Sequence, residues 1–268
     1  MDIIKSKNNN IIKDLIKIRD SSKSRNDKSL FYIEGERIFK DTPKNLIEKI
    51  FIKESDFEVY KKILTNDEIK KTFIVDDSIY NHIKGTVNSQ GIIATVQYNL
   101  LKEINDNIIS KTKNCIVLDN ISDPGNLGTI IRLSEAANIN LIILTNNCCN
   151  IYNPKVIRSS MSSIFRVNLY LSNNIDEMLK CFHKNNFNIY ATSLNTSSIN
   201  FTNANFKSKN LIVFGNEANG ISTNILNKIE KCIKIPMKGQ IESLNVSLAV
   251  AIIGYEIMRQ NNYYETKS

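Results

Sequence analysis

The chain has 268 residues, of which 42% are hydrophobic, so it can bury a sizeable core, and we expect two domains. Its 35 Lys and Arg residues outnumber 27 Asp and Glu residues, giving a formal net charge of +8. This excess favours a polyanionic partner such as RNA, with a soluble protein that is merely basic as the alternative. No apolar run approaches the roughly 20 residues that span a bilayer, and the N-terminus lacks an apolar core of signal-peptide length. We therefore expect a cytoplasmic protein without a membrane partner.

The cysteines and histidines give no metal-binding pattern. The five cysteines form no C-x-x-C pair, and only His82 and His183 accompany them. Structural zinc sites use four Cys or His ligands at short, regular spacings. We therefore expect reduced structural thiols and no metal site.

The first part of the chain reads as a small α/β domain. Residues 11–25 place isoleucine and leucine on one helical face and basic residues on the other, which predicts a solvated surface helix. Four apolar segments then alternate with charged helical segments, which is typical of α/β structure; they are residues 31–33, 49–52, 72–76 and 91–96. The polar stretch that follows, residues 98–114, is interpreted as a linker.

The second part repeats a strand and helix pattern. Six apolar segments recur with helical segments between them, at residues 115–119, 141–144, 165–169, 187–192, 211–215 and 232–236. This alternation predicts a mainly parallel sheet covered by helices, with ligands beyond the carboxyl ends of the strands. From the pattern alone we expect an unknotted, Rossmann-like domain, because chains that thread through a loop to form a knot are rare.

Residues 115–138 combine a buried strand, a Pro-Gly turn and a helix. Gly128 and Arg132 share a helix face, and the glycine leaves room beside the guanidinium for a phosphate or a ribose. An Arg132–Glu135 pair on a solvated face is the alternative. A dinucleotide-binding dehydrogenase would need G-x-G-x-x-G at this turn, where the chain has only G-x-x-G, so that class is disfavoured.

Residues 153–167 carry two cations, Arg158 and Arg166, around a serine-rich run. No histidine base lies near in sequence, so nucleophilic serine catalysis is disfavoured. We expect the serines to serve packing and local hydrogen bonds; they are Ser159, Ser160, Ser162 and Ser163.

Two glycine-containing loops follow strands near the C-terminus, at residues 211–222 and 235–249. In the first, Glu217 lies between glycines that let the backbone approach a ligand. In the second, Ser243 is well placed as a helix N-cap, and Asn245 in the first turn suggests a specific hydrogen bond. The helix that follows is apolar nearly all round, which indicates core burial or a homodimer interface.

These segments resemble, in order, the three signatures of the SpoU (TrmH-like) family of RNA ribose 2′-O-methyltransferases, members of the knotted SPOUT superfamily. Asn126 and Arg132 occupy the asparagine and arginine positions of the first signature, and the second matches G-N-E-x-x-G-[IL]-S. Two front segments, residues 28–39 and 89–96, are similar to the family's L30e-like substrate-binding domain.

The resemblance implies an α/β fold with two domains. Residues 1–98 would form the L30e-like RNA-binding domain, residues 99–114 the linker, and residues 115–268 a SPOUT domain whose mainly parallel sheet carries a trefoil knot. The knot would bind the methyl donor S-adenosylmethionine (SAM, or AdoMet) without a metal, and the domain would form a homodimer.

The resemblance also implies roles for individual residues. Arg132 would orient the target nucleotide and help to deprotonate its 2′-hydroxyl, with help from neighbours because a guanidinium is a poor base. The residues expected to position it are Asn126, Glu217, Ser243 and Asn245. The adenosine would be held near Leu194, Gly215, Ile235 and Leu244. The expected RNA contacts are Arg37, Arg158 and Arg166.

We therefore expect a SAM-dependent RNA ribose 2′-O-methyltransferase that acts on 23S rRNA. The two-domain layout favours rRNA, since minimal family members that act on tRNA lack such a front domain. Three alternatives stay open: a tRNA 2′-O-methyltransferase, an rRNA methyltransferase that confers thiopeptide resistance, and a non-catalytic RNA-binding protein of the same fold.

Overall fold

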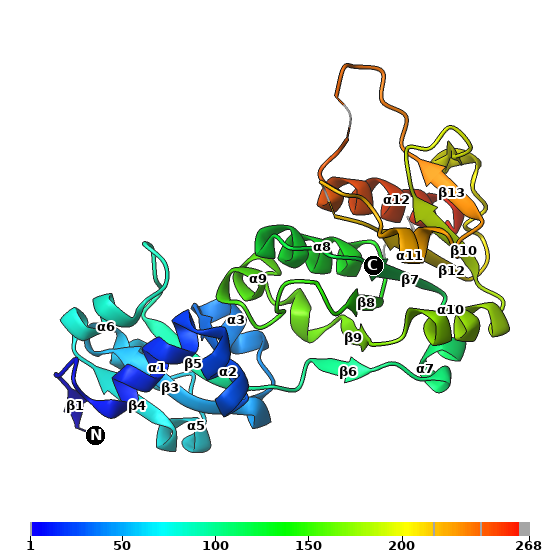
Figure 1. Cartoon of the computed structure of the whole chain (residues 1–268). Coiled ribbons are helices and arrows are strands. Elements are labelled where there is room, and N and C mark those ends of the chain that lie inside the picture. The colour runs from blue at the N-terminus through cyan, green and yellow to red at the C-terminus, as the bar shows by residue number, and fades with distance from the viewer. Residues whose placement is uncertain (1, 217, 242, 263–268) are drawn as a thin grey trace. The chain divides into compact units, whose positions relative to one another are not determined.

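The structure is a computed structural model that describes residues 2–216, 218–241 and 243–262. None of the helices in these ranges is long and apolar enough to cross a membrane. The chain forms two compact units (Figure 1). The first unit is Met1–Asn99 with Asn150–Phe165, and the second is Leu100–Cys149 with Arg166–Ser268.

The described residues of the first unit form a mixed five-stranded sheet. β1 and β3 run parallel to β4, whereas β5 is antiparallel to both β3 and β2. Side by side, the strands are β1 (Ile3–Ile4), β4 (Thr72–Val75), β3 (Ile47–Lys53), β5 (Ile92–Gln97) and β2 (Leu30–Glu34). The four apolar segments predicted as strands here are confirmed.

The helices of the first unit are short. Besides the two N-terminal helices they are α3 (Glu36–Asp41), α4 (Phe57–Lys61), α5 (Asn66–Lys70), α6 (Asp77–Ile83) and α9 (Pro154–Ser159). Single 3-10 turns lie at Lys44–Leu46, Glu54–Asp56 and Ser163–Phe165 in this unit, and at Phe201–Asn203 in the second.

The N-terminal helix predicted over residues 11–25 is in fact two helices, α1 (Asn10–Asp20) and α2 (Ser22–Lys28). Ser21 separates them with extended backbone, and its side chain accepts a hydrogen bond from the Ser24 amide as the N-cap of α2. The apolar face of α1 is buried in the core of the unit, through Ile12, Leu15 and Ile18. The amphipathic helix predicted here is therefore confirmed for α1, since its apolar face is the buried one.

Residues 150–165 cluster with the first unit, although they lie inside the range 115–268 that the resemblance assigns to the methyltransferase domain. The Tyr152 ring stacks on Tyr98 with centroids 3.6 Å apart and packs on Phe31 at 5.2 Å. Burial of these rings ties the segment to β2 and the end of β5. The domain boundaries themselves stay a prediction.

The described residues of the second unit form an eight-stranded sheet in which every neighbouring pair is parallel. The predicted α/β class and mainly parallel sheet are confirmed. Side by side, the strands are β11 (Ile199–Asn200), β13 (Lys231–Lys234), β10 (Asn188–Thr192), β12 (Asn210–Phe214), β7 (Asn114–Leu118), β8 (Leu141–Thr145), β9 (Asn168–Ser172) and β6 (Leu101–Glu103).

The stretch interpreted as a linker is not irregular. Within residues 98–114 the chain forms β6, which pairs with β9 at the edge of the sheet, and then α7 (Asp106–Lys111). Ile109 of α7 is buried in the core. Five leucines and isoleucines scattered through an otherwise polar stretch were too weak a signal for either element.

Helices cover both faces of this sheet. α7, α10 (Ile175–Lys184) and α11 (Thr223–Leu226) pack on one face through a single hydrophobic core. α8 (Pro124–Ala136) and α12 (Val246–Gln260) pack against each other, and Figure 1 shows them on the opposite side of the strands from α10. The carboxyl ends of parallel strands are thereby left free for a ligand site.

Candidate functional site

A cavity of about 540 Å³ lies at the carboxyl ends of β10, β12 and β13. Its wall comes from the loops after these strands and from the residues that precede α12. The four residues expected to hold the adenosine all line it: Leu194, Gly215, Ile235 and Leu244. Ser243 lines it as well. The structure thus brings together side chains that are up to 50 positions apart in the sequence.

The loop after β12 is a tight turn that requires glycine at its first position. The Asn216 and Gly220 backbones exchange two hydrogen bonds, of 3.0 and 2.8 Å. A Cβ atom on Gly215 would lie 2.2 Å from backbone atoms of Gly220 and Ile221, which no side chain can tolerate. Gly215 is therefore fixed by close backbone approach at the cavity wall.

Asp119, which the sequence showed only as the end of a strand, braces this loop. Its buried carboxylate accepts hydrogen bonds from the Ser222 amide at 2.7 Å and the Thr145 hydroxyl at 3.2 Å. It thereby joins the ends of β7 and β8 to the loop after β12. An acidic residue after an apolar strand was the signal that could have identified it.

Asn245, rather than Ser243, is the N-cap of α12, so the predicted cap was wrong by two residues. Its side-chain oxygen accepts from the Ser247 amide at 2.9 Å and the Ser247 hydroxyl at 2.6 Å. Its side-chain amide donates to the Asn126 oxygen at 3.0 Å. The specific hydrogen bond expected of Asn245 is therefore present, and it joins the first and third sequence signatures.

Arg132 is exposed on α8 and makes no hydrogen bond or ion pair with the described residues. The alternative Arg132–Glu135 pair was wrong, because Glu135 instead binds Arg166 through two guanidinium nitrogens. The Arg166 guanidinium therefore already has a carboxylate partner. Arg132, in contrast, has no partner among the described residues and is open to a ligand.

The described wall of the cavity does not include Arg132, Asn126 or Asn245. Within one chain, the described lining of the pocket expected to hold the methyl donor therefore lacks the arginine expected to act on the ribose. Glu217, the remaining predicted site residue, lies outside the described residues.

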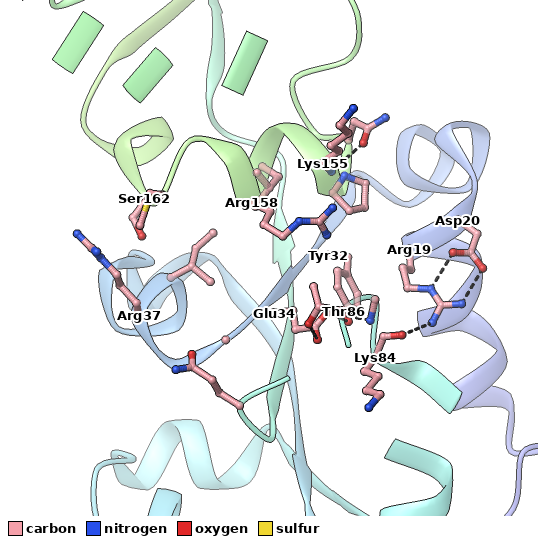
Figure 2. Close-up of a pocket in the computed structure, with 18 of the residues that line it drawn as sticks. Arg19, Asp20, Tyr32, Glu34, Arg37, Lys84, Thr86, Lys155, Arg158 and Ser162 are labelled. Carbon is pink, nitrogen blue, oxygen red and sulfur yellow. Dashed lines mark hydrogen bonds and ion pairs between the residues drawn. The ribbon is translucent and has the colours of Figure 1, made fainter. Parts of the chain in front are cut away.

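The other expected RNA contacts, Arg37 and Arg158, lie in the first unit. Both side chains are exposed, and both line a second cavity of about 770 Å³ (Figure 2). Two of the serines near Arg158 behave as predicted: the Ser159 hydroxyl donates to the Lys155 carbonyl at 2.7 Å, and the Ser160 hydroxyl to the Ile157 carbonyl at 2.8 Å.

Comparison with known proteins gives a consistent result. The profile of the SpoU rRNA Methylase family matches residues 113–255. An uncharacterized tRNA/rRNA methyltransferase of Synechocystis sp. is 30% identical over 189 residues, which cover 70% of this chain and 68% of that protein. The 23S rRNA (guanosine(2553)-2′-O)-methyltransferase RlmP of Bacillus subtilis is 26% identical over 263 residues, covering 95% and 98% of the two chains.

The fold is also similar to a solved structure, an AdoMet-bound rRNA methyltransferase from Sinorhizobium meliloti. The two superpose with a TM-score of 0.80 at 21% sequence identity, over 96% of this chain and 97% of the other. At that identity the similarity describes the fold alone.

Proposed function

Because this chain belongs to the SpoU rRNA Methylase family, we propose that it transfers the methyl group of SAM to a ribose 2′-hydroxyl of 23S rRNA. The observation that carries the proposal is the single cavity around Leu194, Gly215, Ile235 and Leu244 at the ends of the parallel strands. The 2′-O position and the 23S substrate take support from the name of the Bacillus subtilis relative, which matches nearly the whole chain.

The cavity suits SAM in size and lining. Its volume of about 540 Å³ lies within the range of sites for ligands of this size. Leu194, Ile235 and Leu244 offer apolar surface to an adenine ring, while the turn at Gly215 brings main-chain groups to the wall. When bound, SAM supplies a methyl group already activated by its sulfonium.

The protein must then align the 2′-oxygen and remove its proton. We assign the alignment to Arg132, whose guanidinium has no partner among the described residues and can bind a phosphate or ribose oxygen in a fork geometry. Asn126 lies in the first turn of the same helix and accepts a hydrogen bond from Asn245, so this pair would position the N-terminal turn of α8.

We further propose that the active form is a homodimer. α12 leaves an apolar stripe exposed one helical turn apart, with Leu248 54%, Ile252 37% and Tyr255 47% exposed. Since Arg132 does not line the cavity of its own chain, it would serve the cavity of the partner. The knot and the L30e-like nature of the front domain belong to the same proposal, supported by the family resemblance and the similar fold.

The direct test is the chemical identity of the product. Deproteinised rRNA and bulk tRNA would be incubated with the protein and SAM, digested to nucleosides and analysed by mass spectrometry. A 2′-O-methylnucleoside from rRNA supports the proposal, whereas a base-methylated nucleoside refutes the 2′-O assignment. A 2′-O-methylnucleoside from tRNA alone refutes rRNA as the substrate.

A further inference from the structure

Asn216 lies where the methyl-donor cavity meets the loop that leads into α8. It is half-buried, comes two residues after β12 and lines the cavity. Its side chain also contacts Asn120 and Ser122, in the loop between β7 and α8, although Asn120 lies 96 positions earlier in the sequence. All three residues belong to the second unit. One side chain therefore joins the cavity wall to the approach to α8.

Each end of the Asn216 side chain has its own partners. The side-chain nitrogen donates hydrogen bonds to the Asn120 carbonyl at 2.9 Å and to the Ser122 hydroxyl at 3.4 Å. The side-chain oxygen accepts from the backbone amides of Ala218 at 2.9 Å and Asn219 at 3.4 Å. The reverse orientation would set the oxygen against a carbonyl and the nitrogen against two N–H groups. The bridge therefore requires a donor and an acceptor on one side chain.

The loop that Asn216 holds leads directly into α8. Asn120 has a left-handed backbone, with φ +59°, and its amide donates to the Thr145 hydroxyl at 3.2 Å, so the peptide groups on both sides of this residue are held. Three residues later, Asp123 caps α8 by accepting a hydrogen bond from the Asn126 amide at 2.8 Å. A displacement of the Asn120 carbonyl therefore moves the first turn of α8.

The start of α8 is thus held from two sides. The Asn245 side chain donates to Asn126 and ties α8 to α12, whereas Asn216 ties the approach to α8 to the turn at the cavity. Asp119 does not duplicate the Asn216 contact, because its carboxylate binds the Ser222 amide, beyond the far end of the turn. Loss of the Asn216 bridge would therefore leave the cavity turn without its direct contact to the approach to α8.

We propose that Asn216 is a positioning residue for methyl transfer. It holds the approach to α8, and through it Asn126 and Arg132, in a fixed position relative to the turn of the methyl-donor cavity. The inference rests on the proposed function, in which SAM fills this cavity and Arg132 aligns the ribose. Asn216 then contributes to the rate of transfer through alignment, separately from the affinity for SAM. In the proposed dimer, it acts on the site that the Arg132 of its own chain completes.

Two substitutions of the same residue separate the bridge from the turn. In Asn216→Ser the hydroxyl oxygen can still accept from the amide two residues on, as serine does in turns, but the side chain is too short to reach the Asn120 carbonyl. We expect Asn216→Ser to bind SAM within about threefold of wild type and to transfer methyl about tenfold more slowly at saturating SAM and rRNA. Asn216→Ala removes both contacts, so it should lose the same rate and also bind SAM about tenfold more weakly.

The affinity is measured by calorimetric titration of the full-length protein with SAM, and the rate by single-turnover transfer of labelled methyl to deproteinised rRNA. Asn227→Ser is the matched control, because Asn227 is exposed, lies outside the described cavity wall and makes no side-chain hydrogen bond with the described residues. Its rate and its affinity should both equal those of wild type. A merely structural role of Asn216 would instead lower the melting temperature, the affinity and the rate together in Asn216→Ser.

Mixed dimers, isolated with two affinity tags after co-expression, test the route through α8. A dimer of one Arg132→Ala chain and one Gly215→Ala chain keeps one complete site, formed by the cavity of the first chain and the arginine of the second, so it should recover the activity of one site. A dimer of one Arg132→Ala chain and one Asn216→Ser chain should stay about tenfold below it, because its remaining Arg132 is the one that has lost its support.

Three results would overturn the role of Asn216 while wild type transfers methyl to rRNA: a rate of Asn216→Ser equal to that of wild type, a loss of SAM affinity as large as its loss of rate, or equal activity of the two mixed dimers. Wild-type protein that transfers no methyl would refute the proposed function, and the role of Asn216 with it. A mixed dimer of Arg132→Ala and Gly215→Ala without activity would refute the service of Arg132 to the partner, and the rate and affinity of Asn216→Ser then decide the role of Asn216.

Discussion

The side-chain amide of Asn245 donates a hydrogen bond to the side-chain oxygen of Asn126 across 3.0 Å, although the two residues are 119 positions apart. Asn245 caps α12, and Asn126 lies in the first turn of α8. One contact therefore fixes the starts of the two helices that carry Arg132 and the apolar stripe.

Asn245→Ser tests this contact separately from the helix cap. Serine caps helices about as well as asparagine, so the free energy of unfolding should change by only about 0.5 kcal/mol. The shorter side chain does not reach Asn126. We therefore expect the rate of methyl transfer to fall about tenfold, which corresponds to the free energy of about one hydrogen bond.

The control for this prediction is a double-mutant cycle measured by methyl-transfer kinetics. Asn126→Ala should cause a similar loss, and the double variant should lose little more than either single variant. Fully additive losses would contradict a joint role for the pair.

Gly215→Ala should weaken SAM binding. The added methyl group would meet the Gly220 and Ile221 backbone at 2.2 Å, so the turn at the cavity must open. Calorimetric titration with SAM should show at least about a tenfold loss. Gly239→Ala is the matched control, because a Cβ there meets no atom within 4 Å; an equal loss in both variants would argue against the role of the Gly215 turn.

Asp119 should act as a hydrogen-bond acceptor for the cavity loop. Asp119→Ala leaves the Ser222 amide without its partner, which should lower the free energy of unfolding by about 1–3 kcal/mol. Because the cavity loop loses this contact, the affinity for SAM should fall about tenfold. Asp119→Asn keeps one acceptor oxygen and should bind SAM within a few-fold of wild type. Equal loss in the two variants would mean that the charge, and not the hydrogen bond, is required.

Leu248→Glu should convert the dimer to a monomer. Leu248 is 54% exposed, so a charge there leaves the isolated chain stable but is costly in a buried interface. Light scattering across a concentration series should show at least about a tenfold weaker dimer. Ile63→Glu, at a position 46% exposed in the first unit, is the control. A wild-type monomer, or a dimer that both variants retain, would contradict the proposed interface.

The sequence predicted the strands well because buried parallel strands are continuous apolar runs bounded by turns. The segments that became β7, β8, β10 and β12 all had this form. The prediction from sequence failed at β6 and α7, where edge position and partial exposure leave only scattered apolar residues. Helix starts were also misplaced, since Ser21 and Asn245 act as caps through local backbone geometry that composition does not specify.

For the site, the signatures identified residues that the fold gathers around one cavity, from Leu194 to Leu244. They did not identify Asp119: its place after an apolar strand was the available signal, but its hydrogen bonds to Ser222 and Thr145 depend on long-range packing. Nor could they show that residues 150–165 pack with the first unit, which depends on the rings of Tyr98 and Tyr152 meeting across the fold. Long-range packing of this kind is absent from local sequence.

The central claim is tested most directly by the transfer of labelled methyl from SAM to deproteinised rRNA, with wild type and Arg132→Ala, scored by the resistance of the methylated linkage to alkaline cleavage. We predict alkali-resistant label in rRNA with wild type and at least about a hundredfold less with Arg132→Ala, while SAM binding is retained because we assign Arg132 to the target nucleotide and not to SAM. Alkali-sensitive label, or equal transfer by both proteins, would contradict the account.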